Sequence, residues 1–266
     1  MSIPPFALVL TAAGSSLRFN CGLEGAQDVK KEFLKIDGHS ILYRAAEPFF
    51  EIPGLSAMVV TCRKGCEDEA VVALEDLADI ASIPMLFIPG GSTRQESVHL
   101  ALEALAGLDI PMELVAIQDG ARPFTTPELI IRTMALAWQA GGAVPALAVT
   151  DSIRRIDAEG RIIETTDRRG LVRVQTPQIF SFSRLLEAHR SAEGNSATDD
   201  AEVFIRAGNE CLVSEGDEAN RKITYAGDIP DAEEQVRRYV EERERGRKNR
   251  SNDEMFRRFI HSGDGQ

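Results

Sequence analysis

Short runs of apolar residues alternate along the chain with longer amphipathic stretches. Five runs are apolar at nearly every position, which is typical of strands covered on both faces: Phe6–Thr11, Ala57–Thr61, Met85–Ile88, Leu114–Ile117 and Ala143–Val149. In Glu67–Ile80 and Gln95–Leu108 the apolar residues instead recur every three or four positions, the period of a helix. This alternation predicts an α/β fold with a mostly parallel sheet, helices on both faces, and ligands bound beyond the carboxyl ends of the strands.

One helix carries clear signals at both of its ends. Thr126 is a good N-cap, Pro127 lacks the donor that a first helical turn leaves unpaired, and Glu128 faces the positive end of the helix dipole. Gly141 and Gly142 then interrupt the helical pattern. We therefore expect a helix between Thr126 and Gly141.

The segment 152–167 breaks the alternation of strands and helices. An Asp-Ala-Glu-Gly turn at 157–160 lies between two stretches in which polar and apolar residues alternate, which predicts a β-hairpin. This hairpin has little apolar area of its own, and an isolated hairpin is barely stable in water. We expect a projecting arm over about residues 151–172 that packs on a second subunit.

The composition of the chain changes after Pro230. Residues 231–266 hold nine acidic and nine basic residues, so the net charge of −12 belongs to the first 230 residues. We therefore divide the chain into a domain at 1–230 and a charged helical tail at 231–266. Because 233–248 has few apolar residues, its helix is expected to be a solvated end rather than a binding device.

The overall charge and hydropathy argue against several classes of protein. Thirty Lys and Arg residues against 42 Asp and Glu residues are unlike a general nucleic-acid binder or a polybasic membrane protein. No apolar run approaches the roughly 18–20 residues of a bilayer span, and the first five residues lack the pattern of a signal peptide. We expect a cytoplasmic protein with neither a membrane nor a nucleic acid as its partner.

The sequence also lacks several chemical signatures. Neither the four cysteines nor the four histidines have the spacing of metal ligands, so the cysteines are expected to be reduced thiols. Cys62 and Cys66 are close enough in sequence to keep redox chemistry as a minor alternative. The loop Ala12–Arg18 is neither Gly-x-Gly-x-x-Gly nor a Walker loop, which argues against a dinucleotide oxidoreductase and a P-loop ATPase.

Loops that follow two predicted strands carry residues suited to a nucleotide. In Ala12–Arg18, small residues let backbone N–H groups approach an anion, and Arg18 adds a positive charge. Lys30 and Lys31 follow about a dozen residues later and are placed to fold over the same anion. The loop Pro89–Ser97 offers glycines, hydroxyls and a helix N-terminus. Taken alone, each feature is equally well explained as an ordinary turn or a surface charge pair.

The fourth predicted strand ends in Gln118-Asp119-Gly120-Ala121-Arg122-Pro123, which places a carboxylate at the carboxyl edge of the sheet. Oxygen ligands at such an edge are suited to Mg²⁺ beside nucleotide phosphates, so Asp119 is the candidate metal ligand. An Asp that opens a Gly-containing turn is also common where no metal binds.

Taken together, these motifs resemble those of the 2-C-methyl-D-erythritol 4-phosphate cytidylyltransferases, which use CTP in the non-mevalonate route to isoprenoids. The resemblance covers about residues 6–230, and its nine motifs follow the family's order. They are Ala12-Ala13-Gly14 with Arg18, Lys31-Glu32-Phe33-Leu34, Gly90-Gly91-Ser92 with Arg94 and Ser97, Asp119-Gly120-Ala121-Arg122-Pro123, Val149-Thr150-Asp151-Ser152, Thr166-Asp167-Arg168, Gln175-Thr176-Pro177-Gln178, Thr198-Asp199-Asp200 and Lys222-Ile223-Thr224.

The resemblance implies a Rossmann-like nucleotidyltransferase fold, Mg²⁺, CTP and a polyol phosphate as substrates, and a homodimer with interlocking arms. By motif position, Arg18 and Lys31 would stabilise the transition state. Lys222 and Arg168 would position the attacking phosphate, and Mg²⁺ would lie near Asp119. Arg168 and Ser152 would reach the site of the neighbouring subunit. The other expected substrate-binding residues are Ala12, Ala13, Gly14, Gly91, Ser92, Ser97, Gly120, Arg122 and Thr198.

The chain departs from the family pattern at six positions. They are Ser16 for Gly, Lys30 for Pro, Gln118 for His, Ser152 for Thr, Ala219 for Asp and Arg221 for Ile. The stretch Asn20–Val29 also lengthens the loop, which leaves open whether Lys30 or Lys31 reaches the phosphates.

Two alternative functions therefore remain open. One is a relative that loads cytidine onto ribitol phosphate or another polyol phosphate, and the other is a nucleotide-binding homologue without catalysis. Arg168 and the Ala-Ala-Gly motif favour methylerythritol phosphate as the substrate. Catalysis is favoured because every cationic position of the family is still filled.

Overall fold

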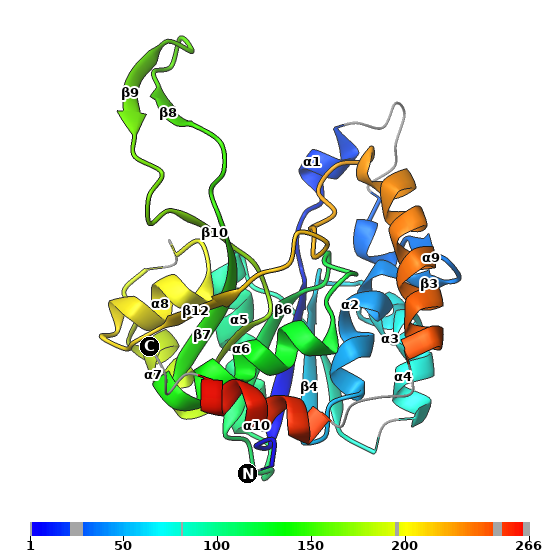
Figure 1. The fold of residues 1–266 in the computed structure, drawn as a ribbon. Coiled ribbons are helices and arrows are strands. Elements are labelled where there is room, and N and C mark those ends of the chain that lie inside the picture. Colours follow the sequence, from blue (N-terminus) through cyan, green and yellow to red (C-terminus); the bar gives the residue numbers. More distant parts are fainter. Residues whose placement is uncertain (1, 22–28, 81, 195–196, 247–251, 263–266) are drawn as a thin grey trace.

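The computed structural model describes residues 2–21, 29–80, 82–194, 197–246 and 252–262. Its centre is an eight-stranded sheet in the order β10-β7-β11-β6-β1-β4-β5, with β12 also paired to β7 (Figure 1). β1 (Phe6–Ala12) lies between β4 (Leu55–Cys62) and β6 (Leu114–Asp119) and is parallel to both. β5 (Met85–Pro89) pairs in parallel with β4. The predicted α/β fold with a mostly parallel sheet is confirmed.

The other half of the sheet mixes strand directions. β7 (Gly142–Ala148) pairs in parallel with β12 (Leu212–Glu215) but runs antiparallel to β10 (Val172–Val174) and β11 (Gln178–Ser181). β11 is also antiparallel to β6. The sequence predicted none of β10, β11 and β12, because each has only three or four residues and too short a pattern to recognise.

Alternate residues of β1 face opposite layers of helices, as the pleat of a strand requires. Phe6, Leu8 and Leu10 belong to one core cluster, together with residues of α2 (Ile41–Phe50) and α6 (Pro127–Ala140). The intervening Ala7 and Val9 belong to a second cluster. Both faces of this strand are therefore buried, which explains why its sequence is apolar throughout.

The second cluster packs three helices on the opposite face of the sheet. They are α5 (Arg94–Ala106), α7 (Phe182–Ser191) and α8 (Asp200–Arg206). α5 agrees with the predicted Gln95–Leu108 helix to within two residues at each end, but α7 and α8 were not predicted. Helices on both faces of the sheet are thus confirmed.

The sequence predicted the helix after Thr126 correctly but missed a break within the segment 67–80. The Thr126 hydroxyl accepts a hydrogen bond from the backbone N–H of Leu129, and α6 ends at Gly141 in the left-handed conformation, as predicted. The single helix expected over Glu67–Ile80 is instead divided into α3 (Glu67–Ala73) and α4 (Glu75–Ile80). The break at Leu74 lets Leu74 and Leu77 both enter the core beside α2.

Small elements between β1 and α2 form one rim of the sheet's carboxyl edge. They are α1 (Leu17–Asn20), η1 (Lys31–Phe33), β2 (Lys35–Ile36) and β3 (His39–Ser40). Most of the long loop Asn20–Val29 lies outside the described residues, although the amide of Asn20 donates a hydrogen bond to the carbonyl of Val29 across its base. Phe19 and Ile36 are buried in a third, smaller cluster that anchors this rim.

The predicted hairpin is confirmed as β8 (Ile153–Ile156) and β9 (Ile162–Thr166), an antiparallel pair that extends away from the body of the molecule (Figure 1). Its side chains form no core of their own. Ile156, Ile162 and Ile163 are each more than half exposed. An arm that exposes several isoleucines in a single chain is suited to a partner surface.

The charged tail forms two helices that pack on the domain. α9 (Asp228–Gly246) buries Ala232 and Val236 in the third cluster, and α10 (Asn252–Ser262) lies against α6 and buries Phe256 in the main core (Figure 1). The expectation of a solvated helix end therefore missed these contacts, since a few apolar residues on one face are enough to dock a helix. Within the described part of the chain, no helix is long and apolar enough to span a membrane.

All four cysteines are free thiols. Burial raises the pKa of the Cys62 thiol to about 11, and burial together with Glu69 raises the pKa of Cys66. A thiol with a raised pKa holds little reactive thiolate at neutral pH, so these two residues are poorly suited to redox chemistry.

The docking of α10 yields a test of stability. Phe256 is fully buried, so Phe256→Ala should lower the free energy of unfolding by about 3–5 kcal/mol, because it removes apolar contact and leaves a cavity. Arg258→Ala, at an exposed position of the same helix, should change that free energy by less than about 0.5 kcal/mol. Urea unfolding monitored by circular dichroism measures both, and equal effects would contradict the packing of α10.

Candidate active site

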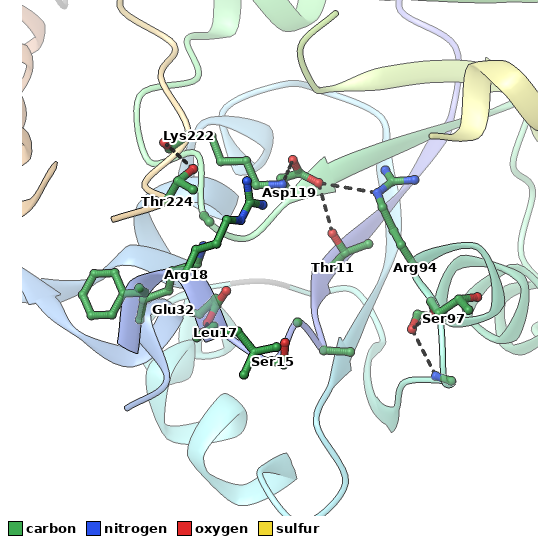
Figure 2. A pocket seen from close by; sticks show the side chains of 18 of the residues that line it. Thr11, Ser15, Leu17, Arg18, Glu32, Arg94, Ser97, Asp119, Lys222 and Thr224 are labelled. Carbon is green, nitrogen blue, oxygen red and sulfur yellow. Dashed lines mark hydrogen bonds and ion pairs between the residues drawn. The ribbon is translucent and has the colours of Figure 1, made fainter. Parts of the chain in front are cut away.

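A cavity of about 520 Å³ opens at the carboxyl edge of the sheet. Its wall is built by the loops after β1, β5 and β6, with Lys222 and Thr224 closing one side (Figure 2). Because parallel strands bring their carboxyl ends to one edge, loops distant in sequence meet here. The site motifs predicted from three separate strand ends are therefore neighbours in space.

The loop after β1 forms one wall of the cavity. Ala13, Gly14 and Arg18 line it, and the Arg18 side chain extends from α1 toward Lys222 and Asp119 (Figure 2). Ser16 has a φ of 51°, in the left-handed region that favours glycine. Its hydroxyl donates a hydrogen bond of 3.3 Å to Glu32. The usual glycine is thus replaced by a residue that keeps the left-handed backbone and adds a contact to the neighbouring wall.

Lys31, rather than Lys30, is the lysine that lines the cavity. Its ammonium donates a 2.8 Å hydrogen bond to the carbonyl of Ile223, so it lies against the segment that carries Lys222. Burial lowers the pKa of Lys31, and the nearby charges of Lys222 and Arg18 lower it further, although Glu32 and Asp119 act in the opposite direction. The positive charges of this wall repel one another, and an anion would relieve that repulsion.

The loop after β5 is held in place by short side-chain bonds. Gly91 donates its backbone N–H to the Ser97 hydroxyl at 3.1 Å, and that hydroxyl donates to the carbonyl of Thr93 at 2.8 Å. Ser92 donates both its N–H and its hydroxyl to Glu96. A Cβ on Gly91 would lie 2.3 Å from the Glu96 side chain, so only glycine fits this turn as it is formed. Gly91, Ser92 and Ser97 all line the cavity, as expected.

Asp119, the last residue of β6, is a carboxylate surrounded by three cationic side chains. Lys222 donates a 2.7 Å hydrogen bond to its Oδ2, while the Nε of Arg122 lies 3.7 Å from the same oxygen. The Nε of Arg94 lies 3.7 Å from Oδ1, and the Thr11 hydroxyl donates to Oδ1 at 3.4 Å (Figure 2). Burial alone raises the pKa of a carboxyl, but Lys222, Arg94 and Arg122 outweigh it and hold the pKa of Asp119 below its ordinary value. Asp119 is therefore an anion at neutral pH.

Three expected residues shape the wall without facing the cavity. The N–H of Gly120 donates to the carbonyl of Thr11 at 2.9 Å, and a Cβ there would lie 2.7 Å from Leu42. Ala12 is buried beside it. Arg122 reaches away from the cavity to donate a 2.7 Å bond to the carbonyl of Asn220. Within one chain these residues contact Thr11 and the segment before Lys222, and their part in substrate binding stays a prediction.

Three other predicted residues do not join the cavity within one chain. Ser152 and Arg168 are exposed on and beside the arm, and Arg168 donates to the carbonyl of Thr150. Thr198 is exposed, and its N–H and hydroxyl both donate to Glu202 at 2.7 and 2.9 Å. Thr198 thus lies just before Asp199, the N-cap of α8, and is tied to the first turn of that helix by Glu202.

Two residues with no predicted role are part of the site. Arg94, the first residue of α5, lines the cavity with a side chain that is 27% exposed, and Glu32 forms part of the opposite wall. Burial raises the pKa of Glu32. Both residues belong to the family motifs. Arg94 follows a helix N-cap and Glu32 follows Lys31, but these positions in the sequence do not show where the two side chains point.

Asp119 lies at the base of the cavity, where a carboxylate suits a hard cation. Among the described residues there is no group of three or more His, Cys, Asp and Glu side chains that would enclose a metal. Mg²⁺ keeps several waters and binds commonly through one or two carboxylates and substrate phosphates, so one aspartate in a cavity lined by Arg and Lys side chains fits it.

The family model described as 2-C-methyl-D-erythritol 4-phosphate cytidylyltransferase matches residues 6–238. This chain belongs to that family. It is therefore a nucleotidyltransferase, and the resemblance predicted from its motifs is confirmed.

Two cytidylyltransferases are similar to this chain over nearly their whole length, and a longer bifunctional enzyme is similar over about half of its own. A 2-C-methyl-D-erythritol 4-phosphate cytidylyltransferase of Cereibacter sphaeroides is 40% identical over 227 residues, which are 85% of this chain and 95% of that protein. The crystal structure of a protein with that name from Thermus thermophilus is 29% identical, covers 88% of this chain and 99% of its own, and gives a TM-score of 0.64. A bifunctional enzyme IspD/IspF of Rhodopseudomonas palustris is 38% identical, matching 85% of this chain and 54% of that protein.

The two adjacent lysines give a matched test of the cavity. In a cytidylyltransferase assay, Lys31→Ala should lower kcat/KM by about 10²-fold, because a preorganised cation is removed from the site. Lys30→Ala makes the same chemical change one residue away, at a position that does not line the cavity, and should change kcat/KM less than about threefold. Circular dichroism controls for folding. A larger loss from Lys30→Ala would reverse the assignment.

Proposed function

We propose that this cytidylyltransferase transfers the cytidylyl group of CTP to 2-C-methyl-D-erythritol 4-phosphate and releases pyrophosphate. The observation that supports it most is the gathering of Arg18, Lys31, Arg94 and Lys222 around one cavity in a protein of net charge −12. Two anionic substrates must be brought together in this reaction, and their mutual repulsion is the main barrier to binding. A local excess of cations offsets that repulsion.

The reaction is an in-line displacement at the α-phosphorus of CTP. An oxygen of the methylerythritol phosphate forms a bond to this phosphorus while the bond to the bridging oxygen of the β-phosphate breaks. The electron pair of that bond leaves with pyrophosphate, and no covalent enzyme intermediate is required. Catalysis then consists of positioning and of charge stabilisation in a preorganised site.

Each cation has a distinct proposed part in this displacement. Arg18 and Lys31, which reach the cavity from the loop after β1, stabilise the charge that builds on the equatorial oxygens and on the leaving pyrophosphate. Lys222 lines the cavity beside Lys31, whose ammonium donates to the carbonyl of Ile223, and positions the attacking phosphate. The small side chains of the loops after β1 and β5, which line the cavity, leave room for the cytidine.

Asp119 is the proposed ligand of Mg²⁺. When bound, the cation supplies Lewis-acid stabilisation of the nucleotide phosphates. Lys222 donates a hydrogen bond to Oδ2, so the carboxylate that would hold Mg²⁺ also binds this lysine. Thr11 and Arg94 hold the other oxygen and keep the carboxylate at the cavity floor.

We further propose a homodimer whose arms complete each other's sites. Ser152 and Arg168 lie outside their own cavity, so they would act from the arm of the partner. The exposed isoleucines of the hairpin supply apolar area for the interface. The four free thiols suit the reducing cytoplasm, which is the proposed compartment.

The substrate is tested by pyrophosphate release from CTP and Mg²⁺ with methylerythritol phosphate or with ribitol phosphate. We expect turnover with methylerythritol phosphate and a kcat/KM for ribitol phosphate at least about tenfold lower, because a site shaped for one polyol leaves polar groups unpaired with another. Preference for ribitol phosphate would overturn the substrate. No pyrophosphate release with either substrate would favour a nucleotide-binding homologue without catalysis.

The composite site is tested by mixing two inactive variants. In a dimer of one Arg168→Ala chain and one Lys31→Ala chain, one site keeps both residues and the other loses both. Random exchange of equal amounts should restore about a quarter of the wild-type rate, since half of the dimers are mixed and each has one intact site. Exchange is verified by native mass spectrometry with one chain isotope-labelled. No recovery after exchange would mean that Arg168 acts within its own chain or not at all.

A further inference from the structure

Arg94 is held by a second carboxylate that lies behind the cavity. Its Nη1 forms an ion pair of 2.7 Å with Oδ2 of Asp200, the first residue of α8. Its Nε lies 3.7 Å from Oδ1 of Asp119. One guanidinium therefore bridges a carboxylate at the cavity floor and a carboxylate of the protein interior. The rigid fork of a guanidinium fixes the direction of one end when the other end is bound.

Asp200 is an unusual residue to place at this depth. Its side chain is 0% exposed, and a buried carboxylate is costly unless other groups compensate its charge. Burial alone raises the pKa of a carboxyl, but Arg94 and His189 outweigh burial and lower the pKa of Asp200 below its ordinary value. The charge on Asp200 is thus retained inside the protein by the same arginine that lines the cavity.

His189 of α7 lies beside the other carboxylate oxygen of Asp200. Its Nε2 lies 3.4 Å from Oδ1 of Asp200, and its side chain is also 0% exposed. The ring stacks on His99 of α5, with centroids 6.1 Å apart and planes inclined by 12°. The imidazole is therefore fixed between α5 and α8, where it limits how far the Asp200 carboxylate can turn.

The N-cap of the helix does not use this carboxylate. The N-cap of α8 is Asp199, whose Oδ1 accepts the backbone N–H of Glu202 at 2.9 Å. Within the described residues, neither carboxylate oxygen of Asp200 accepts a hydrogen bond from the backbone. Asp199 thus caps the helix and accepts a 3.0 Å hydrogen bond from Gln178, whereas the direct ion pair with Arg94 belongs to Asp200.

We propose that Asp200 and His189 are positioning residues, which hold Arg94 so that it fixes the Asp119 carboxylate at the floor of the cavity. Asp119 then receives Arg94 and Thr11 on Oδ1, while Oδ2 stays directed toward Lys222 and the substrates. Without the charge on Asp200, Arg94 loses its second anchor and is drawn toward Asp119 and toward the phosphates. The inference rests on the cytidylyl transfer proposed above.

The first experiment compares Asp200→Asn with Asp199→Asn. Both variants neutralise one carboxylate at the start of α8, and asparagine keeps the helix cap at position 199. We expect Asp200→Asn to lower kcat by roughly tenfold with little change in the KM for CTP, because a misplaced group costs more in the transition state than in binding. Asp199→Asn should stay within about twofold of wild type. An unchanged kcat in Asp200→Asn, or an equal loss in both variants, would overturn the proposal.

A double-mutant cycle separates positioning through Arg94 from a general loss of stability. In an Arg94→Gln background, Asp200→Asn should have almost no further effect on kcat, since the residue it acts through is already gone. Independent effects that multiply would contradict the proposal. The thermal midpoint of each variant is measured alongside, and any variant that does not fold is replaced by the His189 pair described next.

The His189 pair provides rescue by a conservative change. His189→Gln keeps a nitrogen donor near Asp200 and should retain most of kcat, whereas His189→Leu removes it and should lower kcat about as much as Asp200→Asn. Equal kcat values for the two variants would count against the role of the imidazole.

A readout without turnover distinguishes this inference from the proposed function. In protein labelled with ¹⁵N-arginine, a guanidinium held at both ends has slowed rotation and separate Nη signals. The Arg94 signal, assigned by its loss in Arg94→Gln, should show this restraint in wild type and lose it in Asp200→Asn. If Asp200→Asn frees Arg94 but the wild-type protein releases no pyrophosphate, only the proposed function is refuted. If the wild-type enzyme is active but Arg94 stays equally restrained in Asp200→Asn, only the positioning role is refuted.

Discussion

The site depends on a single buried anion surrounded by cations. Asp119 stays ionised because Lys222, Arg94 and Arg122 outweigh the cost of its burial, and in return it keeps three positive groups from being pushed apart. Removing one partner of such a cluster leaves an uncompensated charge, so the residues stabilise one another only as a set. The sheet supplies what the set requires, since strands whose carboxyl ends coincide deliver these groups from different parts of the chain.

The parts of the fold that the sequence predicted are those with a long, regular pattern. The parallel strands β1, β4, β5 and β6 are apolar on consecutive residues because both of their faces are covered. The hairpin and α6 carried turn and cap residues whose effect is local. β10, β11 and β12 were missed because each is too short to show a pattern of its own, and all three pair with β7, which is distant in the sequence. The break at Leu74 was missed because it depends on the packing of Leu74 and Leu77 in the core, which is a tertiary contact.

The site was predicted unevenly, and the differences have physical causes. Strand-end residues such as Asp119 were placed correctly because the end of a parallel strand fixes which edge they occupy. Arg94 was quoted in a motif without a role, since the bridge it forms between Asp119 and Asp200 exists only in three dimensions. The choice between Lys30 and Lys31 also required the structure, because the turn of η1 directs only one of two adjacent side chains into the cavity.

The register of β1 against β6 places Thr11 directly beside Asp119. In a sheet, adding or removing one residue reverses the side to which every later side chain points. Insertions and deletions within these two strands would therefore send Asp119 into a helix layer, whereas a longer loop after α1 leaves it where it is. The additional residues of the stretch 20–29 are an example, since they lengthen a loop and leave the strand register unchanged. Divergence among relatives should accordingly change loop lengths on this rim while the strand lengths beneath it stay constant.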